Sequence, residues 1–199
     1  MAGNKSPVGV LALQGDFREH IAVLKSLGAD AVGVRRPVEL AEVSGLIIPG
    51  GESSVMDKLT RLFDLAEPLK NAIADGLPVW GTCAGLIMLA DTVLDGIEGQ
   101  QSLGGLEIAV RRNAFGSQLD SFETDLSIPV VGDPKLHAVF IRAPIVETVS
   151  SAVSTLAALP DGRIVAVEQG NLLGTSFHPE MTGDTRFHEY FLSKVASAK

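Results

Sequence analysis

The segment PVWGTCAGLIMLA, residues 78–90, indicates the fold most directly. Its first three residues are typical of a short buried strand, and the apolar run that ends at Ala90 predicts a helix. Between the two lies the turn Gly81-Thr82-Cys83-Ala84-Gly85, whose glycines leave room for a sharp reversal of the backbone. A strand that passes through a tight turn directly into a helix is a building unit of an α/β sheet.

The same alternation extends back to the N-terminus. Short apolar runs predict strands at residues 8–13, 31–34 and 45–48, and the first is apolar throughout, as in strands that are covered on both faces. Apolar residues at helical spacing predict helices at 17–27, 37–43, 53–63 and 65–74, the third of them capped by Ser53 or Ser54. Strands and helices that alternate with short connections predict a parallel sheet with helices on both faces.

The pattern changes at about Leu103, after which short strands dominate. Strands are predicted at residues 106–110, 139–141, 164–167 and 172–175, with hairpin turns at Asp161-Gly162 and at 169–171, and a final helix at 185–198. We therefore expect an α/β three-layer sandwich with a mostly parallel central sheet and a smaller antiparallel strand region. Because no linker or repeat interrupts the chain, we expect residues 1–199 to form a single domain.

Composition excludes several classes of protein. The net charge is −8 over 199 residues, which argues against a nucleic-acid binder. No run approaches the roughly 20 apolar residues of a membrane span, and no targeting signal is recognised, so we expect a cytoplasmic protein. Only one cysteine, Cys83, is present, which excludes an internal disulfide and a Cys-rich zinc site, and we expect no metal or cofactor.

Cys83 lies at the centre of the motif Gly-x-nucleophile-x-Gly. In such a turn the central residue is held in a strained conformation, which costs roughly 1–3 kcal/mol and usually persists only where function requires it. The N-terminus of the following helix favours the thiolate form of the cysteine, which is the nucleophile. The alternative is a buried structural cysteine, which is common for free thiols.

A cysteine nucleophile needs a base, and His178 has the most distinctive setting of the four histidines. It follows a predicted strand, and Pro179 favours an extended conformation at His178, so that His178 and Glu180 should project on the same side. The other histidines are interpreted as structural: His20 on a helix surface, His137 in a loop and His188 on the terminal helix. His20 also follows a loop at a strand end, where it could line a site.

The segment Pro49-Gly50-Gly51-Glu52-Ser53-Ser54 follows the strand predicted at 45–48. Ligands of open α/β sheets bind beyond the carboxyl ends of the strands, and two glycines allow backbone N–H groups to point into a site, as an oxyanion hole requires. The alternative is a tight turn that leads into a capped helix.

Taken together, these motifs resemble the class I glutamine amidotransferase family, and within it the glutaminase subunits of pyridoxal 5′-phosphate synthases. The similarity extends over residues 8–191, and no motif position departs from the family pattern. Segments 81–85 and 176–180 are shared by many amidotransferases, whereas residues 13–20 and 140–144 are specific to this subfamily. Residues 91–103 match no motif that we can align.

The resemblance implies a Cys83-His178-Glu180 triad that hydrolyses L-glutamine to glutamate and ammonia through a thioester. It implies an oxyanion hole formed by the backbone N–H groups of Gly51 and Ala84, and glutamine contacts at Gly51, Glu52, Ser53, Arg112, Ile141 and Arg142. It also implies a partner, a (β/α)₈ synthase subunit that receives the ammonia, in a complex of twelve copies of each subunit whose glutaminase activity rises on docking.

Three alternatives remain open at this point. The first is a glutaminase that serves another synthase. The second is a reactive-cysteine α/β protein that senses stress or redox state, and the third is a catalytically silent scaffold. Residues 13–20 and 140–144 argue against the first, the His-x-Glu pair after a late strand argues against the second, and the intact set of motif residues argues against the third.

Overall fold

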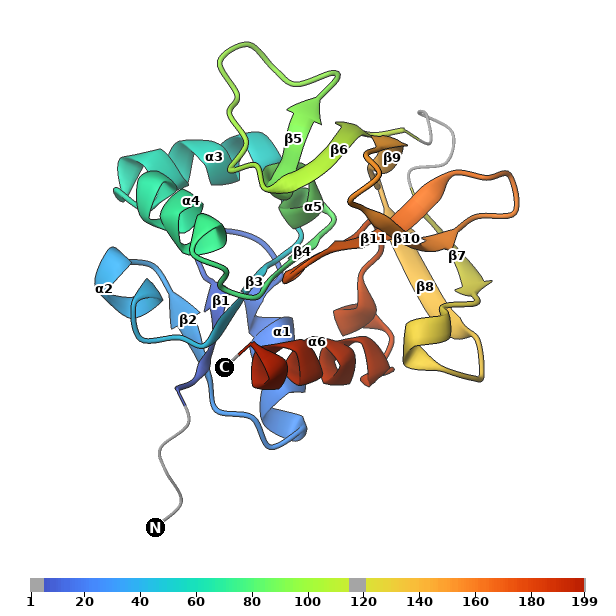
Figure 1. Cartoon of the computed structure of the whole chain (residues 1–199), viewed down its shortest axis with the longest axis horizontal. Coiled ribbons are helices and arrows are strands. Elements are labelled where there is room, and N and C mark those ends of the chain that lie inside the picture. Colours follow the sequence, from blue (N-terminus) through green and yellow to red (C-terminus); the bar gives the residue numbers. More distant parts are fainter. Residues whose placement is uncertain (1–5, 115–120, 199) are drawn as a thin grey trace.

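The computed structural model describes residues 6–114 and 121–198. Within these residues a ten-stranded sheet runs in the order β2-β1-β3-β4-β12-β11-β9-β6-β5, with β10 paired to β11 (Figure 1). Five neighbouring strands of this sheet are parallel to one another. They are β1 (Val8–Leu11), β2 (Ala31–Val34), β3 (Gly45–Ile48), β4 (Val79–Thr82) and β12 (Leu172–Thr175).

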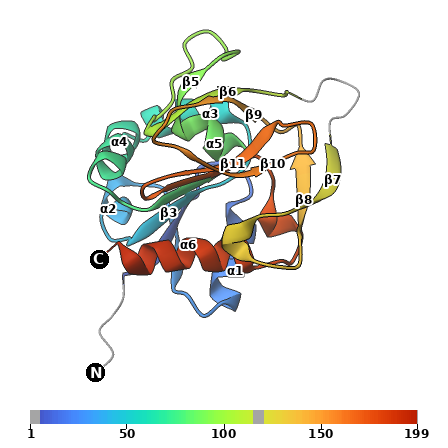
Figure 2. The ribbon, with the colours of Figure 1, turned by 45° about the vertical axis from the view of Figure 1, so that its right-hand side comes forward.

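Helices cover both faces of the parallel strands (Figure 2). Consecutive residues of β3 show the two faces, because Leu46 and Ile48 belong to one apolar cluster and Ile47 belongs to the other. The first cluster packs α2 (Pro37–Leu40), α3 (Ser53–Leu62), α4 (Ala66–Ala74) and α5 (Ala84–Leu89), and the second packs α1 (Phe17–Ser26) and α6 (Arg186–Ser197). The expected three layers with a mostly parallel sheet are therefore confirmed.

Antiparallel strands extend one side of the sheet. They are β6 (Leu106–Arg111), β9 (Ile145–Val149), β10 (Ser154–Ala158) and β11 (Ile164–Gln169), and β5 (Ala90–Val93) pairs with β6 in parallel. A separate two-stranded sheet joins β7 (Ser121–Leu126) to β8 (Leu136–Ile141). The hairpins predicted at Asp161-Gly162 and at 169–171 connect β10 to β11 and β11 to β12.

Every helix and strand predicted from the sequence is present, but among the described residues four strands were missed. They are β5, β7, β9 and β10. β5 follows α5 without a break, so its apolar start was assigned to the helix, and β7 carries Glu123, Thr124 and Asp125 in place of an apolar run. The predicted cap of α3 was wrong. Glu52 occupies that position, and its carboxylate accepts the Ser54 N–H at 3.0 Å.

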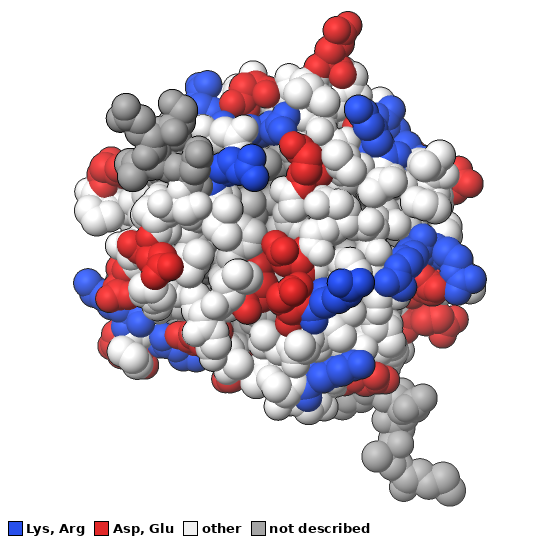
Figure 3. All heavy atoms as spheres, turned by 180° about the vertical axis from the view of Figure 1, so that it is seen from behind, with Lys and Arg blue, Asp and Glu red and all other residues white. Residues whose placement is uncertain are grey.

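Short 3-10 turns occur at Pro129–Val131 and at Pro179–Met181, and the second lies directly after β12. In the part of the chain that the structure describes, no helix is long and apolar enough to cross a membrane. On the face seen in Figure 3, Lys and Arg side chains lie in small groups beside Asp and Glu. That mixture agrees with the negative net charge and offers no continuous basic surface.

Candidate active site

Cys83 occupies a strained turn between β4 and α5. Its backbone has φ 48° and ψ −101°, a conformation that residues other than glycine rarely adopt. The flanking glycines permit it, because a Cβ on Gly81 would lie 2.4 Å from the carbonyl group of Gly85, and a Cβ on Gly85 would lie 2.0 Å from the carbonyl oxygen of Ile48. The turn places the thiol at the carboxyl end of β4 and at the N-terminus of α5.

His178 and Glu180 follow β12, the strand next to β4 in the sheet. The two side chains are almost completely buried, and Nδ1 of His178 lies 2.7 Å from Oε1 of Glu180. The structure thus brings the two side chains together, but not by the predicted extended chain, since Pro179 to Met181 form a 3-10 turn. The backbone N–H of His178 is held by the carbonyl of Val139 in β8 at 2.9 Å.

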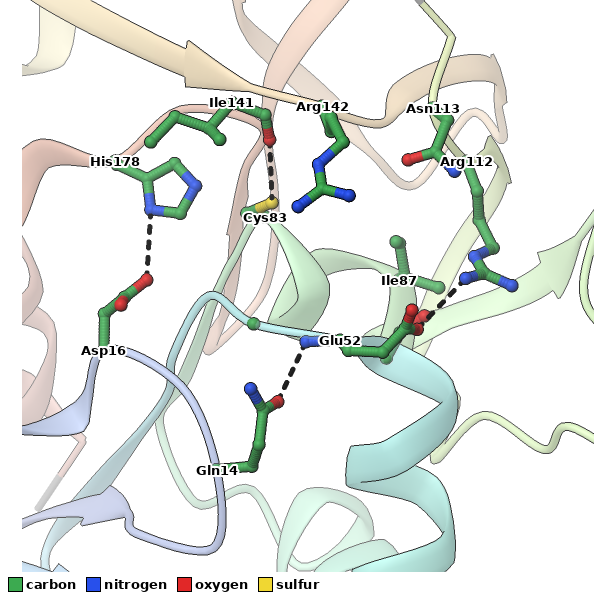
Figure 4. Close-up of a pocket in the computed structure, with 12 residues that line it drawn as sticks. Gln14, Asp16, Glu52, Cys83, Ile87, Arg112, Asn113, Ile141, Arg142 and His178 are labelled. Carbon is green, nitrogen blue, oxygen red and sulfur yellow. Dashed lines mark hydrogen bonds and ion pairs between the residues drawn. The ribbon is translucent and has the colours of Figure 1, made fainter. Parts of the chain in front are cut away.

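The other ring nitrogen of His178 points toward Cys83 (Figure 4). Burial by itself lowers the pKa of His178, but the interactions with Cys83 and then with Glu180 outweigh it and raise the pKa to about 10. His178 is therefore an imidazolium at neutral pH. Asp16 lies on the opposite side of the ring, with Oδ2 3.7 Å from Nδ1 of His178, and burial raises the pKa of that carboxyl.

Cys83 and His178 open into a cavity of about 400 Å³ (Figure 4). Six other residues that the sequence analysis singled out line the same cavity, namely Gly51, Glu52, Ser53, Arg112, Ile141 and Arg142. Glu180 lies behind His178, and Ala84 is the buried first residue of α5. The Cys83 Sγ lies 3.9 Å from the carbonyl oxygen of Ile141, at the end of β8.

Opposite charges line the end of the cavity away from His178. Arg112 donates to Oε1 of Glu52 at 3.1 Å and to Oε1 of Gln100 at 3.0 Å, and its own backbone N–H is held by Asp95 at 2.7 Å. Gln100 also donates to the hydroxyl of Ser53 at 3.0 Å, so the loop before β6 braces two cavity residues. Residues 91–103, which matched no motif, therefore support residues of the cavity wall from behind.

The Glu52 carboxylate is ionised in this setting. Burial raises its pKa, but hydrogen bonds from Ser54 and the charges of Arg112 and Arg142 outweigh that effect and lower the pKa. Arg142, at φ 43°, follows β8 and directs its guanidinium into the cavity between Cys83 and Arg112 (Figure 4). The cavity thus presents both an anion and cations to a bound molecule.

Comparison with known proteins agrees with this geometry. The family model of the SNO glutamine amidotransferase family matches residues 10–197. The chain belongs to this family. Similar members include the pyridoxal 5′-phosphate synthase subunit PdxT of Leifsonia xyli subsp. xyli, 72% identical over 98% of each chain, and that of Clavibacter michiganensis subsp. michiganensis, 64% identical over 98% of this chain and 94% of the relative.

Solved structures agree with the assignment to this family. A crystal structure described as a glutamine amidotransferase superimposes with a TM-score of 0.89 at 46% identity, covering 95% of this chain and 98% of that one. A chain of the PurLQS structure from Thermotoga maritima superimposes with a TM-score of 0.66 at 20% identity, covering 94% and 98%, and shows the shared fold alone.

Four residues that line the cavity of this amidotransferase were not assigned to the site from the sequence, namely Gln14, Asp16, Ile87 and Asn113. Gln14 accepts the Glu52 N–H at 2.8 Å, and a Cβ on Gly51 would lie 2.4 Å from its side-chain oxygen. Gln14 and Asp16 follow β1, so the rule that ligands bind beyond strand ends already indicated them. Ile87 lies one helical turn after Cys83, and no sequence signal indicated Asn113.

Two of the remaining histidines of the amidotransferase differ from their predicted placement. His20 is fully buried rather than on a helix surface, and it contacts both His188 and Glu180. His137 lies in β8 rather than in a loop, exposed between Glu123 and Asp125, whose hydrogen bonds raise its pKa. His188 lies on α6, as predicted, and is fully buried.

One group of acidic and imidazole side chains in the described part of the chain is compact enough to hold a metal ion. It consists of Asp16, His178 and Glu180, whose candidate ligand atoms lie within 4.8 Å of one another. The nitrogen that would serve as a ligand, Nδ1 of His178, is already hydrogen-bonded to Glu180 at 2.7 Å. The donor set is therefore engaged in a carboxylate–imidazole pair.

Proposed function

We propose that this chain is the glutaminase subunit of a pyridoxal 5′-phosphate synthase, which hydrolyses L-glutamine and passes the ammonia to a synthase subunit. The observation that carries the hydrolysis is the cavity itself, with a cysteine and an imidazolium at one end and a Glu52–Arg112 pair at the other. The synthase is inferred from the relatives that carry this name at 64–72% identity.

Cys83 is the nucleophile and His178 the acid–base group. In the proposed reaction Cys83 attacks as a thiolate, and the proton is held on His178, whose pKa is raised to about 10. The thiolate attacks the side-chain carbonyl carbon of glutamine, and His178 gives its Nε2 proton to the amide nitrogen as the C–N bond breaks. Ammonia departs, and the acyl group stays bound to Cys83 as a thioester. A water molecule that His178 deprotonates then hydrolyses the thioester to glutamate and restores Cys83.

Backbone N–H groups supply the oxyanion hole in this proposal. Ala84 is the first residue of α5, where the N–H has no acceptor within the helix, and it lies next to the nucleophile. Gly51 supplies the second N–H from the loop after β3. Loss of one such donor typically slows acyl transfer about a hundredfold or more. Glu180 holds the ring of His178 and stabilises its positive charge.

The substrate is recognised by the charges at the other end of the cavity. The ammonium group of glutamine pairs with Glu52, and its carboxylate pairs with Arg112 and Arg142, as two charge-assisted contacts of opposite sign. Ser53, Gly51 and the Ile141 backbone complete the contacts. A free amino acid carries both charges at neutral pH, so this end selects a zwitterion over a neutral amide.

The partner is a (β/α)₈ synthase subunit, and we propose twelve copies of each subunit in the complex, with glutaminase activity that rises on docking. A reduced compartment is required because Cys83 must stay a free thiol, and we therefore place the protein in the cytoplasm. Light scattering of the mixed subunits measures the complex mass directly, and a mass other than twelve-plus-twelve would reject that stoichiometry.

The function is tested by incubating the protein with L-glutamine, alone and with a synthase subunit, and measuring glutamate. We expect strong stimulation by the partner and loss of activity in Cys83→Ala and His178→Asn. A wild-type chain that yields no glutamate in the assembled complex would overturn the proposal. A chain that hydrolyses glutamine but is stimulated only by another synthase would keep the chemistry and replace the partner.

A further inference from the structure

A chain of buried polar side chains continues behind Glu180 into the core. Oε1 of Glu180 contacts His178, and its other oxygen, Oε2, lies 3.4 Å from Nε2 of His20. Nδ1 of His20 lies 3.0 Å from Nε2 of His188 on α6. Glu180, His20 and His188 are all inaccessible or nearly so, which makes each unmet hydrogen bond costly.

The position of the proton on His20 follows from what faces each ring nitrogen. Nε2 of His20 lies between Oε2 of Glu180 and the hydroxyl of Thr82, at 3.4 and 3.3 Å. With the proton on Nδ1, the lone pair of Nε2 would face a buried carboxylate oxygen that no hydrogen bond satisfies within the described residues. With the proton on Nε2, the N–H bonds to the Thr82 hydroxyl, and it is the positive end of this N–H that lies beside Oε2 of Glu180.

The tautomer with the proton on Nε2 of His20 also fixes the proton position on His188. Nδ1 of His20 becomes an acceptor, so His188 must donate from Nε2, and the Nδ1 of His188 is left as an unprotonated nitrogen. Burial lowers the pKa of His188 to about 4, and burial followed by the charges of His188 and His178 lowers that of His20. Trp80 covers both rings edge-on, at 5.6 and 4.9 Å between centroids, and excludes water from them.

We propose that His20 is a positioning residue of the catalytic site: neutral and protonated on Nε2, it donates to Thr82, places its N–H beside Oε2 of Glu180 and so holds that carboxylate in its place against His178. His188 sets this tautomer by donating to the other nitrogen of His20. This inference rests on the proposed function, because Glu180 matters to catalysis only if His178 is the acid–base group.

The tautomer can be measured without any substrate. Imidazole nitrogen chemical shifts from ¹⁵N NMR of the wild-type chain distinguish a protonated from an unprotonated ring nitrogen. We expect His20 to be protonated on Nε2 and unprotonated on Nδ1 at neutral pH. A proton on Nδ1, or on both nitrogens, would overturn the proposal. This result stands even if the chain forms no glutamate, an outcome that would reject the proposed function instead.

A matched pair of variants tests the effect on catalysis. The amide nitrogen of Gln takes the place of Nε2 of histidine, and that of Asn takes the place of Nδ1, so His20→Gln keeps an N–H beside Thr82 and Glu180 and His20→Asn loses it. We expect kcat of the synthase complex to fall about tenfold in His20→Asn, with KM for glutamine changed less than about threefold, and to stay within about threefold of wild type in His20→Gln.

Thermal unfolding of both variants, followed by circular dichroism, separates folding from catalysis. Equal losses of kcat in His20→Asn and His20→Gln, or an unchanged kcat in His20→Asn, would show a merely structural histidine and overturn the proposal. If either variant does not fold, the NMR measurement on the wild-type chain decides alone.

Discussion

Replacing Glu180 by Gln removes one charge from the core and changes almost nothing in size. The carboxylate lies 2.7 Å from Nδ1 of His178, with 0% and 4% of the two side chains exposed. Because glutamine fills the same volume, no cavity forms, and the effect reports the charge and the hydrogen bond. The amide also brings a donor toward the core, where His20 already offers one in the tautomer that we propose.

The size of the effect follows from the kind of bond that is lost. A hydrogen bond to a charged group contributes about 1.5–3 kcal/mol, and each 1.4 kcal/mol corresponds to a factor of ten in rate. We therefore expect kcat for glutamine hydrolysis in the synthase complex to fall about ten- to hundredfold. Since the carboxylate raises the pKa of His178, its loss lowers that pKa and leaves less imidazolium to stabilise the thiolate of Cys83.

Two assays follow the change. Glutamate release in the presence of the synthase subunit gives kcat and KM, and the rate at which iodoacetamide alkylates Cys83 at neutral pH reports the thiolate, since it is the one thiol in the chain. Both rates should fall in Glu180→Gln. Glu189→Gln is the control, because Glu189 is exposed on α6, where its carboxylate accepts the Thr185 hydroxyl bond at 2.7 Å. Unchanged glutamate release in Glu180→Gln would refute the reasoning and reduce the triad to a Cys–His dyad.

Three further predictions concern the same region. The pKa of His178 is raised to about 10, so the imidazolium contributes stability that is complete below the ordinary value of 6.5 and is lost as the pH rises toward 10. In Cys83→Ala the titration midpoint of His178, followed by NMR, should fall well below that of the wild type. An unchanged midpoint would exclude the ion pair. Burial lowers the pKa of His188 to about 4, so between pH 6.5 and 4 the unfolded chain binds a proton that the folded chain does not. As the pH falls over this interval, urea titrations should show the free energy of unfolding of the wild type decreasing by about 3 kcal/mol more than that of His188→Gln. Parallel curves would show that His188 is not buried and neutral. Gln100→Ala removes the hydrogen bonds that link Ser53 to Arg112, and it should raise KM for glutamine about fivefold with little change in kcat. Gln101→Ala changes an exposed neighbouring side chain and should leave both constants unchanged. Equal KM values for the two variants would show that these hydrogen bonds do not matter for substrate binding.

Local chemistry made much of this protein predictable. Apolar runs and helical spacing predicted every strand of the parallel sheet, because a strand covered on both faces must be apolar throughout. The turn at Cys83 was predictable for a related reason, since only glycines at its two sides avoid a collision with the backbone. The strands that the sequence missed, such as β7, are half-exposed and carry polar residues, so their pattern resembles that of a loop.

Contacts between distant segments required the tertiary structure. Glu52 and Arg112 meet across 60 positions of sequence, and His20 reaches His188 across 168, because the order of strands in the sheet differs from their order along the chain. Periodicity along the chain carries no information about that order. The sequence therefore determined the α/β class, the strained cysteine and the pairing of His178 with Glu180. Only the fold decided that a buried histidine chain supports Glu180, because its members come from three elements that sheet packing alone brings together.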